Sequence, residues 1–493
     1  MTFPVWLPFE NEWATFAIFM GGPILVVGLS NIALKVGLLF AAGSRRWVHF
    51  IVGVTSASTP FIFSSQVQPI TLAVIFTILN GLTLNHALFR GIHSQSRKSF
   101  GTVLFPITYG LMVLLFWDYP ELVVIALCVL AISDPLAAQV GQSTPRPSYF
   151  TIWEDEKTVQ GTLSFFVSSF MIIYMGAQTF FDASNNYLFG MGLFTAIGAT
   201  LAEVTSCKGS DNFSIPTVSI LFMIGYMDHV NEQGQFFDLT VSLSTLPLIV
   251  VILLFALAYQ FNSLSRSGFY GGLLMGIIIT LTGGEFYLIP LAVFFILSST
   301  LSQIIKNASF YRTKGSRRDI VQVYANGGFA LILCLVDFLF PNPITFFLFL
   351  ASVAGATADT WGTEFGKLSD KKPVSILDFT PTTHGISGGI TRIGTIGSFL
   401  GSSVIGFTVW IFFPSSPIIL YGIILSGFFA SLFDSYLGAK WQAKFELPNG
   451  HIVEKLELDA KLVSGVAWLG NDWVNFFNTL FAAIVMTLFL QFV

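Results

Sequence analysis

Long apolar runs recur along the whole chain, and they constrain its fold more than any other feature of the sequence. Only 10% of the 493 residues are charged and 54% are hydrophobic, whereas roughly a quarter of the residues of a soluble domain are charged. About 20 apolar residues suffice for a helix to cross the hydrocarbon core of a bilayer, where a helix satisfies its own backbone hydrogen bonds. The sequence therefore predicts an all-α, polytopic membrane protein with about 14 to 17 transmembrane helices.

Sixteen apolar runs can be delimited, eight in each half of the chain, and we expect each to form a helix. The first eight are residues 14–40, 47–65, 69–89, 101–117, 121–133, 160–181, 186–204 and 214–229. The second eight are residues 237–260, 268–282, 285–305, 319–339, 343–358, 390–412, 416–436 and 474–493.

Basic residues alternate from loop to loop. Lysine and arginine gather in loops such as 306–318 and 367–372, and they are absent from the intervening loops 118–121, 181–186 and 340–343. Cytoplasmic loops of membrane proteins carry the excess of lysine and arginine. We therefore expect an integral, multi-pass membrane protein whose basic, potentially active-site loops are cytoplasmic, with both termini on the other side.

The two halves share a polar motif after their fifth apolar run. Asp134 is followed seven residues later by Gly141, and Asp359 is followed seven residues later by Gly366. An even number of spans between two such motifs places both on the same face of the membrane. The sequence therefore predicts two tandem parallel repeats of about eight helices, with domains at residues 1–235 and 236–493.

Two further features follow the motif in the same order. A polar loop ends in a cation and a glycine before the sixth run, as KTVQG at 157–161 and HGISG at 384–388. The seventh run then ends in an acid, Glu203 in one half and Asp434 in the other. Agreement of three features in one order favours a duplication over chance.

Acids, a lysine and glycines at helix ends are suited to a polyphosphate site. Carboxylate oxygens are hard ligands for Mg²⁺, lysine neutralises phosphate charge, and glycines let backbone N–H groups approach phosphate oxygens. Loop charges in membrane proteins are usually just solvated, but charges that abut apolar runs are costly without a role. The acids in such positions are Asp134, Glu203, Asp359, Glu364 and Asp434.

A transporter is the main alternative, because sixteen spans with a duplication would also suit one. Transporters, however, place their polar residues near the bilayer centre. Here the acids stand at the ends of the runs on one face, which favours surface chemistry on a lipid. A purely structural scaffold would not need the repeated acid, glycine and cation sets.

The first half resembles the CTP-dependent polyprenol kinases, the group that contains dolichol kinase and phytol kinase. The segments that carry the resemblance are RRWVHFIVG at 45–53, the 134–141 motif, EKTVQG at 156–161 and residues 202–216, although Gln160 stands where the family usually has glutamate. The resemblance implies Mg²⁺ on Asp134 and Asp211, with Glu203 as a base or second metal ligand. The residues implied to hold the nucleotide phosphates are Lys157, Arg45, Arg46, Gly141, Thr158, Gly161 and Asn212.

The second half resembles the integral membrane family that includes phytyl-phosphate kinase, over most of residues 260–493. The motifs are ADTWGTEFG at 358–366, GISGGITRIGT at 385–395, SLFDSYLGA at 431–439 and NDWVN at 471–475, where Asp472 replaces a common asparagine. The resemblance implies Asp359, Glu364 and Asp434 as catalytic residues, with metal on Asp359 and Asp434. The residues implied to contact nucleotide or phosphate are Arg317, Arg318, Gly366, Gly388, Gly389, Thr391, Asn471 and Asn475.

Together the resemblances imply a bifunctional membrane kinase. It would convert a prenyl alcohol (phytol, geranylgeraniol or farnesol) to the monophosphate and then to the diphosphate, with Mg²⁺ and CTP or another nucleoside triphosphate. The expected partners are prenyl alcohol and prenyl monophosphate lipids and the membrane, and no nucleic acid; the oligomeric state is left open. A cytidylyltransferase acting on a lipid phosphate is a second alternative, since the first-half motif is also similar to phosphatidate cytidylyltransferases.

Overall fold

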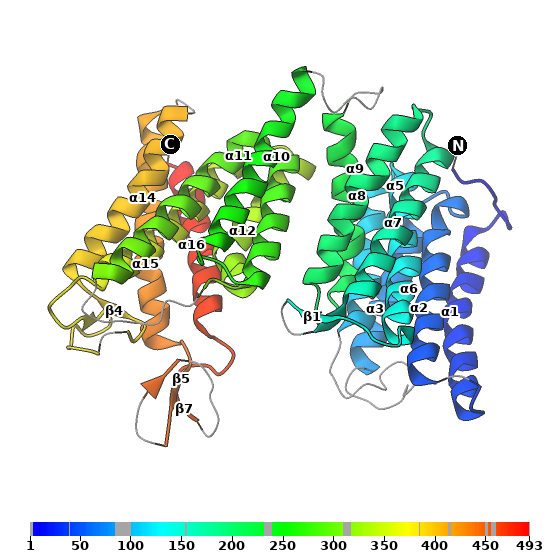
Figure 1. Cartoon of the computed structure of the whole chain (residues 1–493), viewed down its shortest axis with the longest axis horizontal. Helices are drawn as coiled ribbons and strands as arrows, with labels where there is room; N and C mark the ends of the chain where they lie inside the picture. Colours follow the sequence, from blue (N-terminus) through cyan, green and yellow to red (C-terminus); the bar gives the residue numbers. More distant parts are fainter. Residues whose placement is uncertain are drawn as a thin grey trace. The chain divides into compact units, whose positions relative to one another are not determined.

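The described residues form two compact, largely helical units. The computed structural model describes residues 3–38, 40–83, 100–152, 155–230, 239–308, 317–383, 385–412, 416–448, 452–454 and 460–492. Unit 1 spans Met1–Leu246 and unit 2 spans Pro247–Val493; in Figure 1 unit 1 runs from blue to green and unit 2 from green to red. The boundary predicted between residues 235 and 236 lies outside the described residues.

Unit 1 consists of helices α1 to α9, one short β-hairpin and the start of α10. Its helices are α1 (Glu12–Lys35), α2 (Ala41–Ala57), α3 (Val67–Thr83), α4 (Gly101–Phe116), α5 (Pro120–Cys128), α6 (Asp134–Ser143), α7 (Val159–Phe180), α8 (Asn185–Thr205) and α9 (Asp211–His229), with a 3₁₀ turn η1 (Thr59–Phe61). Strands β1 (Tyr149–Thr151) and β2 (Glu156–Thr158) pair antiparallel between α6 and α7.

Helices α5 and α6 form one continuous span, Pro120–Ser143. They are joined by a π-helical segment, η3 (Val129–Ser133), which ends directly before Asp134. A π-type turn widens the helix and frees a carbonyl, and such segments are frequent at functional sites. Within this segment, the Leu130 carbonyl contacts His49 Nε2 of α2 at 3.3 Å.

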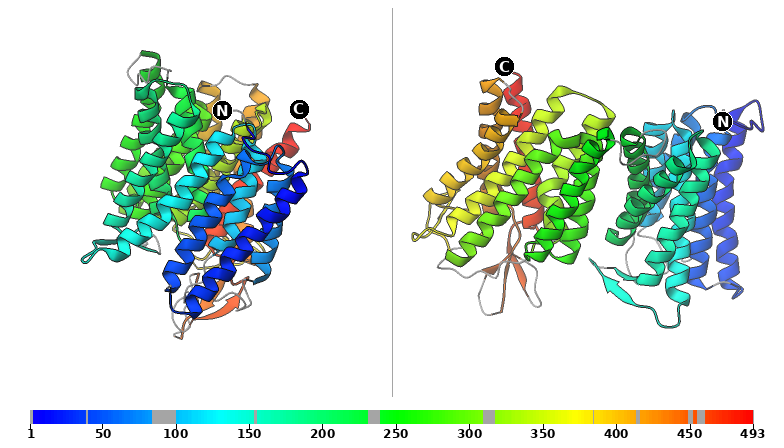
Figure 2. Two further views of the ribbon diagram at one scale, coloured as in Figure 1. Left: turned by 90° about the vertical axis from the view of Figure 1, so that its right-hand side faces the viewer. Right: turned by 45° about the horizontal axis from the view of Figure 1, so that its top comes forward.

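Unit 2 continues from α10 to α16 and has two small sheets. Its helices are α10 (Leu239–Gln260), α11 (Arg266–Ala308), α12 (Ile320–Leu339), α13 (Pro343–Gly366), α14 (Arg392–Phe412), α15 (Pro417–Lys440) and α16 (Asn471–Leu490). Strands β3 (Val374–Ser375) and β4 (Gly389–Ile390) pair antiparallel between α13 and α14. A second sheet has the order β6 (Ile452–Val453), β5 (Lys444–Glu446), β7 (Lys461–Ser464), and lies beyond the adjoining ends of α15 and α16 (Figures 1 and 2).

Helix α11 is too long for a single crossing. Its 43 residues would extend about 64 Å at 1.5 Å per residue, twice the roughly 30 Å of a hydrocarbon core. The helical conformation is broken at Gly284, where φ is 65° and ψ is −158°, a conformation that side chains disfavour. The break divides α11 where the sequence predicted two separate runs, 268–282 and 285–305.

The prediction of an all-α, polytopic membrane protein is confirmed. Within the described residues, ten helices are long and apolar enough to cross a membrane, and shorter apolar helices span Val67–Leu82, Gly101–Phe116 and Leu246–Gln260. Each predicted apolar run overlaps one helix, the α5–α6 span or one part of α11. The run 47–65 is the least accurate, because α2 begins at Ala41 and ends at Ala57, and the run continues over the turn η1. Helix α2 is the most polar of these elements, because it carries Arg45, Arg46 and His49 within 17 residues.

A four-helix module recurs in the two units. In unit 1 the α5–α6 span is followed by a hairpin and by α7, α8 and α9; in unit 2 α13 is followed by a hairpin and by α14, α15 and α16. In both modules successive helices pack against each other, and the last helix packs against the first. The module places the predicted acids of each unit on equivalent helices, because Asp134 and Asp359 lie on the first helix and Glu203 and Asp434 on the third.

Candidate functional sites

Five elements of unit 1 bring charged side chains together around Asp134. The Asp134 carboxylate interacts electrostatically with Asp211 at the start of α9, Lys157 of β2, Glu203 near the end of α8, and Arg45 of α2. His49 of α2 adds its Nε2, 3.9 Å from Asp134 Oδ2. The structure therefore gathers residues that are up to 166 positions apart (Arg45 to Asp211), including the residues predicted to bind metal in this half.

Lys157 stands in the centre of this group. Its Nζ donates to Glu203 Oε1 at 2.5 Å and to the Glu203 backbone carbonyl at 2.9 Å. Burial lowers the pKa of Lys157, but the charges of Glu203, Asp211 and Asp134 outweigh it, so that the pKa is raised above 10.5. Lys157 is therefore a permanent cation at neutral pH, held among three carboxylates.

Thr158 connects the β1–β2 hairpin to α7, and its side chain is the reason why positions 141 and 161 require glycine. Its Oγ1 caps α7 by accepting the Gly161 N–H at 3.1 Å. A Cβ on Gly141 would lie 2.5 Å from this oxygen, and a Cβ on Gly161 would lie 2.7 Å from it. Both glycines are thus required for the close approach of α6, β2 and α7, which holds Lys157 in position.

The remaining predicted residues of unit 1 lie beside the group. Arg46 Nη1 donates to Gln142 Oε1 at 2.6 Å and so ties α2 to α6. Asn212 donates through Nδ2 to Asp211 Oδ1 at 3.0 Å and is buried. Two buried oxygens of the site, Glu203 Oε2 and Asn212 Oδ1, accept no hydrogen bond from the residues that the structure describes.

The donors present in unit 1 suit Mg²⁺ that shares its ligands with phosphate. Within the described residues, no three acidic, histidine or cysteine side chains are grouped closely enough to enclose a metal ion by themselves. Mg²⁺ bound with nucleotides needs only one or two carboxylates, because water and phosphate supply the other ligands. Asp134 and Asp211 provide the hard oxygen donors for such a site.

Two of the predicted acids of unit 2, Asp359 and Asp434, interact electrostatically. The Asp434 carboxylate of α15 interacts electrostatically with Asp359 of α13 and accepts a side-chain hydrogen bond from Asn478 of α16. Asp434 Oδ2 is buried and, within the described part of the chain, accepts no hydrogen bond. An uncompensated pair of acids is costly inside a membrane protein, and oxygen donors of this kind again suit Mg²⁺ with phosphate ligands.

Glu364 makes different contacts. Its Oε1 accepts from Ser302 Oγ at 2.9 Å and lies 2.9 Å from Lys367 Nζ, and Arg318 interacts with it electrostatically. In the part of the chain that the structure describes, these contacts of Glu364 include neither Asp359 nor Asp434, with which it was predicted to act. Five positions on a helix separate two side chains by about 140°, so Asp359 and Glu364 leave α13 in different directions.

The capping of α14 reproduces that of α7. Thr391 Oγ1 accepts the Gly394 N–H at 3.0 Å, and a Cβ on Gly366 would lie 3.6 Å from this oxygen. Thr391 and Gly394 therefore correspond to Thr158 and Gly161. The sequence had instead matched residues 157–161 with residues 384–388. His384 of that predicted match lies outside the described residues. The position that corresponds to Lys157 is Ile390, so the cation of unit 1 has no counterpart at that point.

The other predicted residues of unit 2 have mainly structural surroundings. Gly388 has φ of 91°, and a Cβ there would lie 2.6 Å from the Ala439 backbone nitrogen. Gly389 pairs with Ser375 in the β3–β4 hairpin. The remaining positions are at helix ends: Arg317 and Arg318 precede α12, and Asn471 and Asn475 form the first turns of α16.

Several residues near the sites were not among the predicted site residues. Asn478 follows Asn475 by three positions, a helical spacing that could have indicated it. Beside the β3–β4 hairpin, Ser387 donates hydrogen bonds to the Glu454 carboxylate, and Lys444 Nζ contacts the Ser387 carbonyl. They lie in polar stretches without an apolar flank, where solvated charges are the ordinary expectation.

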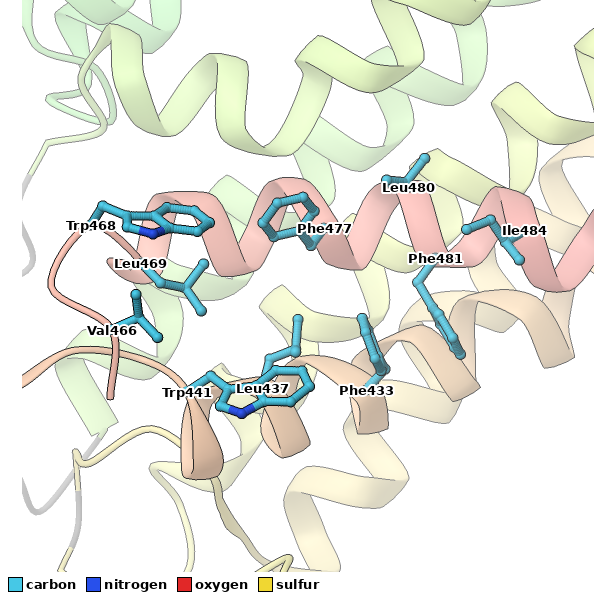
Figure 3. Close-up of a pocket in the computed structure, with 10 residues that line it drawn as sticks. All are labelled: Phe433, Leu437, Trp441, Val466, Trp468, Leu469, Phe477, Leu480, Phe481 and Ile484. Atoms are coloured by element: carbon cyan, nitrogen blue, oxygen red, sulfur yellow. The ribbon is translucent and has the colours of Figure 1, made fainter. Parts of the chain in front are cut away.

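An apolar groove runs between α15 and α16, beside the helix faces that carry Asp434 and Asn478. Its volume is about 400 Å³, within the range of small-molecule sites. Figure 3 shows the lining side chains along the two helices, with Trp441 and Trp468 near the sheet end. Phe433 and Phe481 stack across it with ring centroids 4.0 Å apart.

The chain is similar in sequence to membrane proteins and to a phytol kinase. An uncharacterised membrane protein of Methanocaldococcus jannaschii is 30% identical over 220 residues, which cover 44% of this chain and 90% of the relative. Protein PGR of Arabidopsis thaliana is 29% identical over 47% of this chain and 90% of its own length. A phytol kinase of Synechocystis sp. is 26% identical over 44% of this chain and 92% of its own length. No solved structure matches the chain.

A family model described as integral membrane protein DUF92 matches residues 249–483. This range contains the module from α13 to α16 and both acids, Asp359 and Asp434. The N-terminal half lies outside the matched range. Through its C-terminal part, the chain belongs to the DUF92 family of integral membrane proteins.

Proposed function

We propose that the chain is a membrane prenol kinase that acts in two steps. Unit 1 would phosphorylate a prenyl alcohol, and unit 2 would phosphorylate the resulting monophosphate to the diphosphate. The observation that carries the proposal is the group of Lys157, Asp134, Glu203 and Asp211 in unit 1. The relative named phytol kinase supports the substrate class, and the repeated module supports a second, related reaction in unit 2.

The first transfer breaks the bond between the γ-phosphorus and the β,γ-bridging oxygen and forms a bond to the lipid hydroxyl oxygen. Such chemistry depends on positioning and charge neutralisation. Lys157 and Arg45 supply positive charge for the triphosphate. Glu203 Oε1 is bound by Lys157, so Oε2, which lacks a partner, is the atom that accepts the hydroxyl proton.

Mg²⁺ held by Asp134 and Asp211 would neutralise phosphate charge and orient the phosphates. Both acids interact electrostatically with the Lys157 ammonium. Such a site carries net negative charge while it is empty. Binding of a metal ion would neutralise this charge, so that the triphosphate could then bind. CTP is the proposed donor, because the sequence of unit 1 resembles CTP-dependent kinases. We propose that these loops face the cytoplasm, where the nucleotide is present.

The second transfer has the monophosphate oxygen as acceptor. Asp359 and Asp434 would hold Mg²⁺, and Asn478 keeps Asp434 in place. An acceptor that is already anionic requires additional cations. Arg318 and Lys367 lie at Glu364, and Lys444 lies beside the β3–β4 hairpin, so unit 2 offers cations at two points around the module.

The groove between α15 and α16 suits the prenyl chain of the second substrate. Aromatic side chains form both walls (Figure 3). Asp434 is adjacent in sequence to Phe433, and Asn478 is adjacent to Phe477, so one helix pair carries both the polar site and the groove. Asp434 and Asn478 do not themselves line the groove; we propose that the head group of a bound chain extends from the groove toward Asp434.

Product analysis tests the proposal directly. The purified chain in lipid nanodiscs would receive labelled CTP, Mg²⁺ and a panel of prenyl alcohols, with lipid products resolved by chromatography. We expect prenyl monophosphate to form first and diphosphate to follow, with release of CDP. Release of pyrophosphate with a cytidylylated lipid would indicate the cytidylyltransferase alternative, and the absence of any modified lipid with all nucleoside triphosphates would refute the kinase.

A further inference from the structure

Glu454 is bound to the glycine loop of unit 2 in the way that a phosphate group is usually bound. Its Oε1 accepts the backbone N–H of Ser387 at 2.7 Å, and its Oε2 accepts the Ser387 hydroxyl at 2.8 Å. A backbone N–H beside a glycine in a left-handed conformation is a typical donor to anions. Gly388, with φ of 91°, directly follows Ser387.

A second acid makes this position unfavourable for a carboxylate. Glu454 interacts with Asp434, which has the same charge and also interacts with Asp359. Like charges repel strongly where water is excluded. The two hydrogen bonds from Ser387 thus hold an anion near another acid, Asp434, a place that is suited to a phosphate group accompanied by a cation.

A cation stands beside the same loop. Lys444 Nζ lies 3.4 Å from the Ser387 carbonyl and 3.5 Å from the Ala439 carbonyl, and it forms no ion pair with any residue that the structure describes. An ammonium that contacts only carbonyls can still pair with an anion. Ser387 and Lys444 together therefore supply two donors and a positive charge for one phosphate group.

Few backbone interactions hold Glu454 in place. It follows β6, a strand of two residues at the edge of the β6-β5-β7 sheet. This sheet projects beyond the ends of α15 and α16 (Figure 1), so Glu454 lies outside the helix packing of unit 2.

We propose that Glu454 occupies a phosphate-binding position on the Ser387–Gly388 loop, and that a phosphate group binds there by displacing it and pairing with Lys444. The ligand is a phosphate group of either the nucleotide or the prenyl monophosphate. Only the identity of the ligand rests on the proposed function. Glu454 thereby lowers the affinity of the empty site for phosphate and protects its donors until a substrate arrives.

Binding measurements on the full-length chain in nanodiscs test this inference. Dissociation constants are measured separately for CTP with Mg²⁺ and for farnesyl monophosphate, using wild type, E454Q, E454D and the control E446Q. Glu446 is an exposed acid of β5 in the same sheet. We expect at least about tenfold tighter binding of one ligand to E454Q, since a charged group that competes for two donors is removed, and the ligand that tightens identifies the source of the phosphate.

The other variants sharpen the result. The shorter side chain of E454D cannot reach both donors and should also tighten binding, E446Q should not, and Lys444→Gln should weaken binding in the wild-type and E454Q backgrounds. Unchanged or weaker binding of both ligands to E454Q would overturn the inference. Failure of both E454Q and E454D to fold would overturn it as well, because the fold cannot depend on a residue that leaves its place.

This test is independent of turnover. A chain whose E454Q variant binds phosphate more tightly but phosphorylates no prenyl alcohol refutes the proposed function and supports the role of Glu454. A chain that produces prenyl phosphates with unchanged binding by E454Q leads to the opposite conclusion.

Discussion

Lys157 and Glu203 form an ion pair in which the lysine ammonium donates to both the carboxylate, at 2.5 Å, and the backbone carbonyl of the same residue, at 2.9 Å. The pair fixes the β1–β2 hairpin against the end of α8. Glu203 is only 5% exposed, so the contact is largely shielded from solvent. Structure and proposed chemistry of unit 1 therefore depend on the same two side chains.

The variant Glu203→Gln should stop the phosphorylation of prenyl alcohol while leaving a folded protein. The amide keeps the shape of the side chain but cannot accept the substrate proton, and loss of a general base typically costs 10² to 10⁴ in rate. Lys157 would keep Asp134 and Asp211 as partners, so we expect a stability loss of about 1 to 2 kcal/mol. Alcohol kinase activity and thermal unfolding in detergent are the measurements.

Asp118→Asn is the matched control for this variant, because Asp118 is an exposed acid of the same unit in a loop without basic residues. It should change neither activity nor unfolding temperature. Normal alcohol kinase activity in Glu203→Gln would exclude the assigned role of Glu203.

Gly388→Ala should destabilise unit 2 far more than Gly385→Ala. Both glycines have positive φ, 91° and 88°, which costs a residue with a side chain about 1 kcal/mol. Only at Gly388 would the new Cβ approach the backbone of α15, 2.6 Å from the Ala439 nitrogen, whereas nothing lies within 4 Å at Gly385. The clash should add about 2 kcal/mol.

The unfolding temperatures of the two glycine variants distinguish the cost of positive φ, which both variants bear, from the steric clash with Ala439, which only Gly388→Ala has. We expect Gly388→Ala to lose monophosphate kinase activity as well, with alcohol kinase activity retained. Equal unfolding shifts in the two variants would mean that the loop does not pack against α15 as described.

Leu480→Trp should shift the preference for the length of the prenyl chain. Leu480 lines the groove between α15 and α16, and the larger indole would fill part of its volume of about 400 Å³. KM for a C20 monophosphate should rise about tenfold relative to a C10 monophosphate, because the longer chain loses apolar burial of about 0.8 kcal/mol per CH₂.

Leu488→Trp provides the comparison for the groove, since Leu488 lies on the same helix, is 53% exposed and does not line the groove. It should affect both chain lengths alike. An identical effect of the two tryptophans would place the prenyl chain elsewhere.

The apolar pattern was sufficient to predict the helices and some of the charged residues of the unit 1 site. Runs at 268–282 and 285–305 predicted the division of α11 because Gly283 and Gly284 interrupt them. Asp134 and Glu203 could be predicted because they abut apolar runs and Lys157 because it ends the repeated polar loop, whereas Asp211 was implied only by the resemblance to the polyprenol kinases. The side on which these loops lie stays a prediction.

The contacts of unit 2 could not be predicted as well, for geometric reasons. Sequence spacing treats Asp359 and Glu364 as one motif, whereas a helix directs them about 140° apart. The alignment of 157–161 with 384–388 relied on a cation followed by glycine, while the equivalence is defined by the capping threonines Thr158 and Thr391. Glu454 reaches its loop across 67 residues, a separation that no local pattern encodes.

The central claim is that two separate sites perform consecutive phosphorylations. Asp134→Asn and Asp359→Asn, each verified as folded by thermal unfolding, would be assayed with labelled CTP on farnesol and on farnesyl monophosphate. We predict that Asp134→Asn abolishes phosphorylation of the alcohol and spares that of the monophosphate, and that Asp359→Asn has the reverse effect. Loss of both activities in either folded variant would contradict two independent sites.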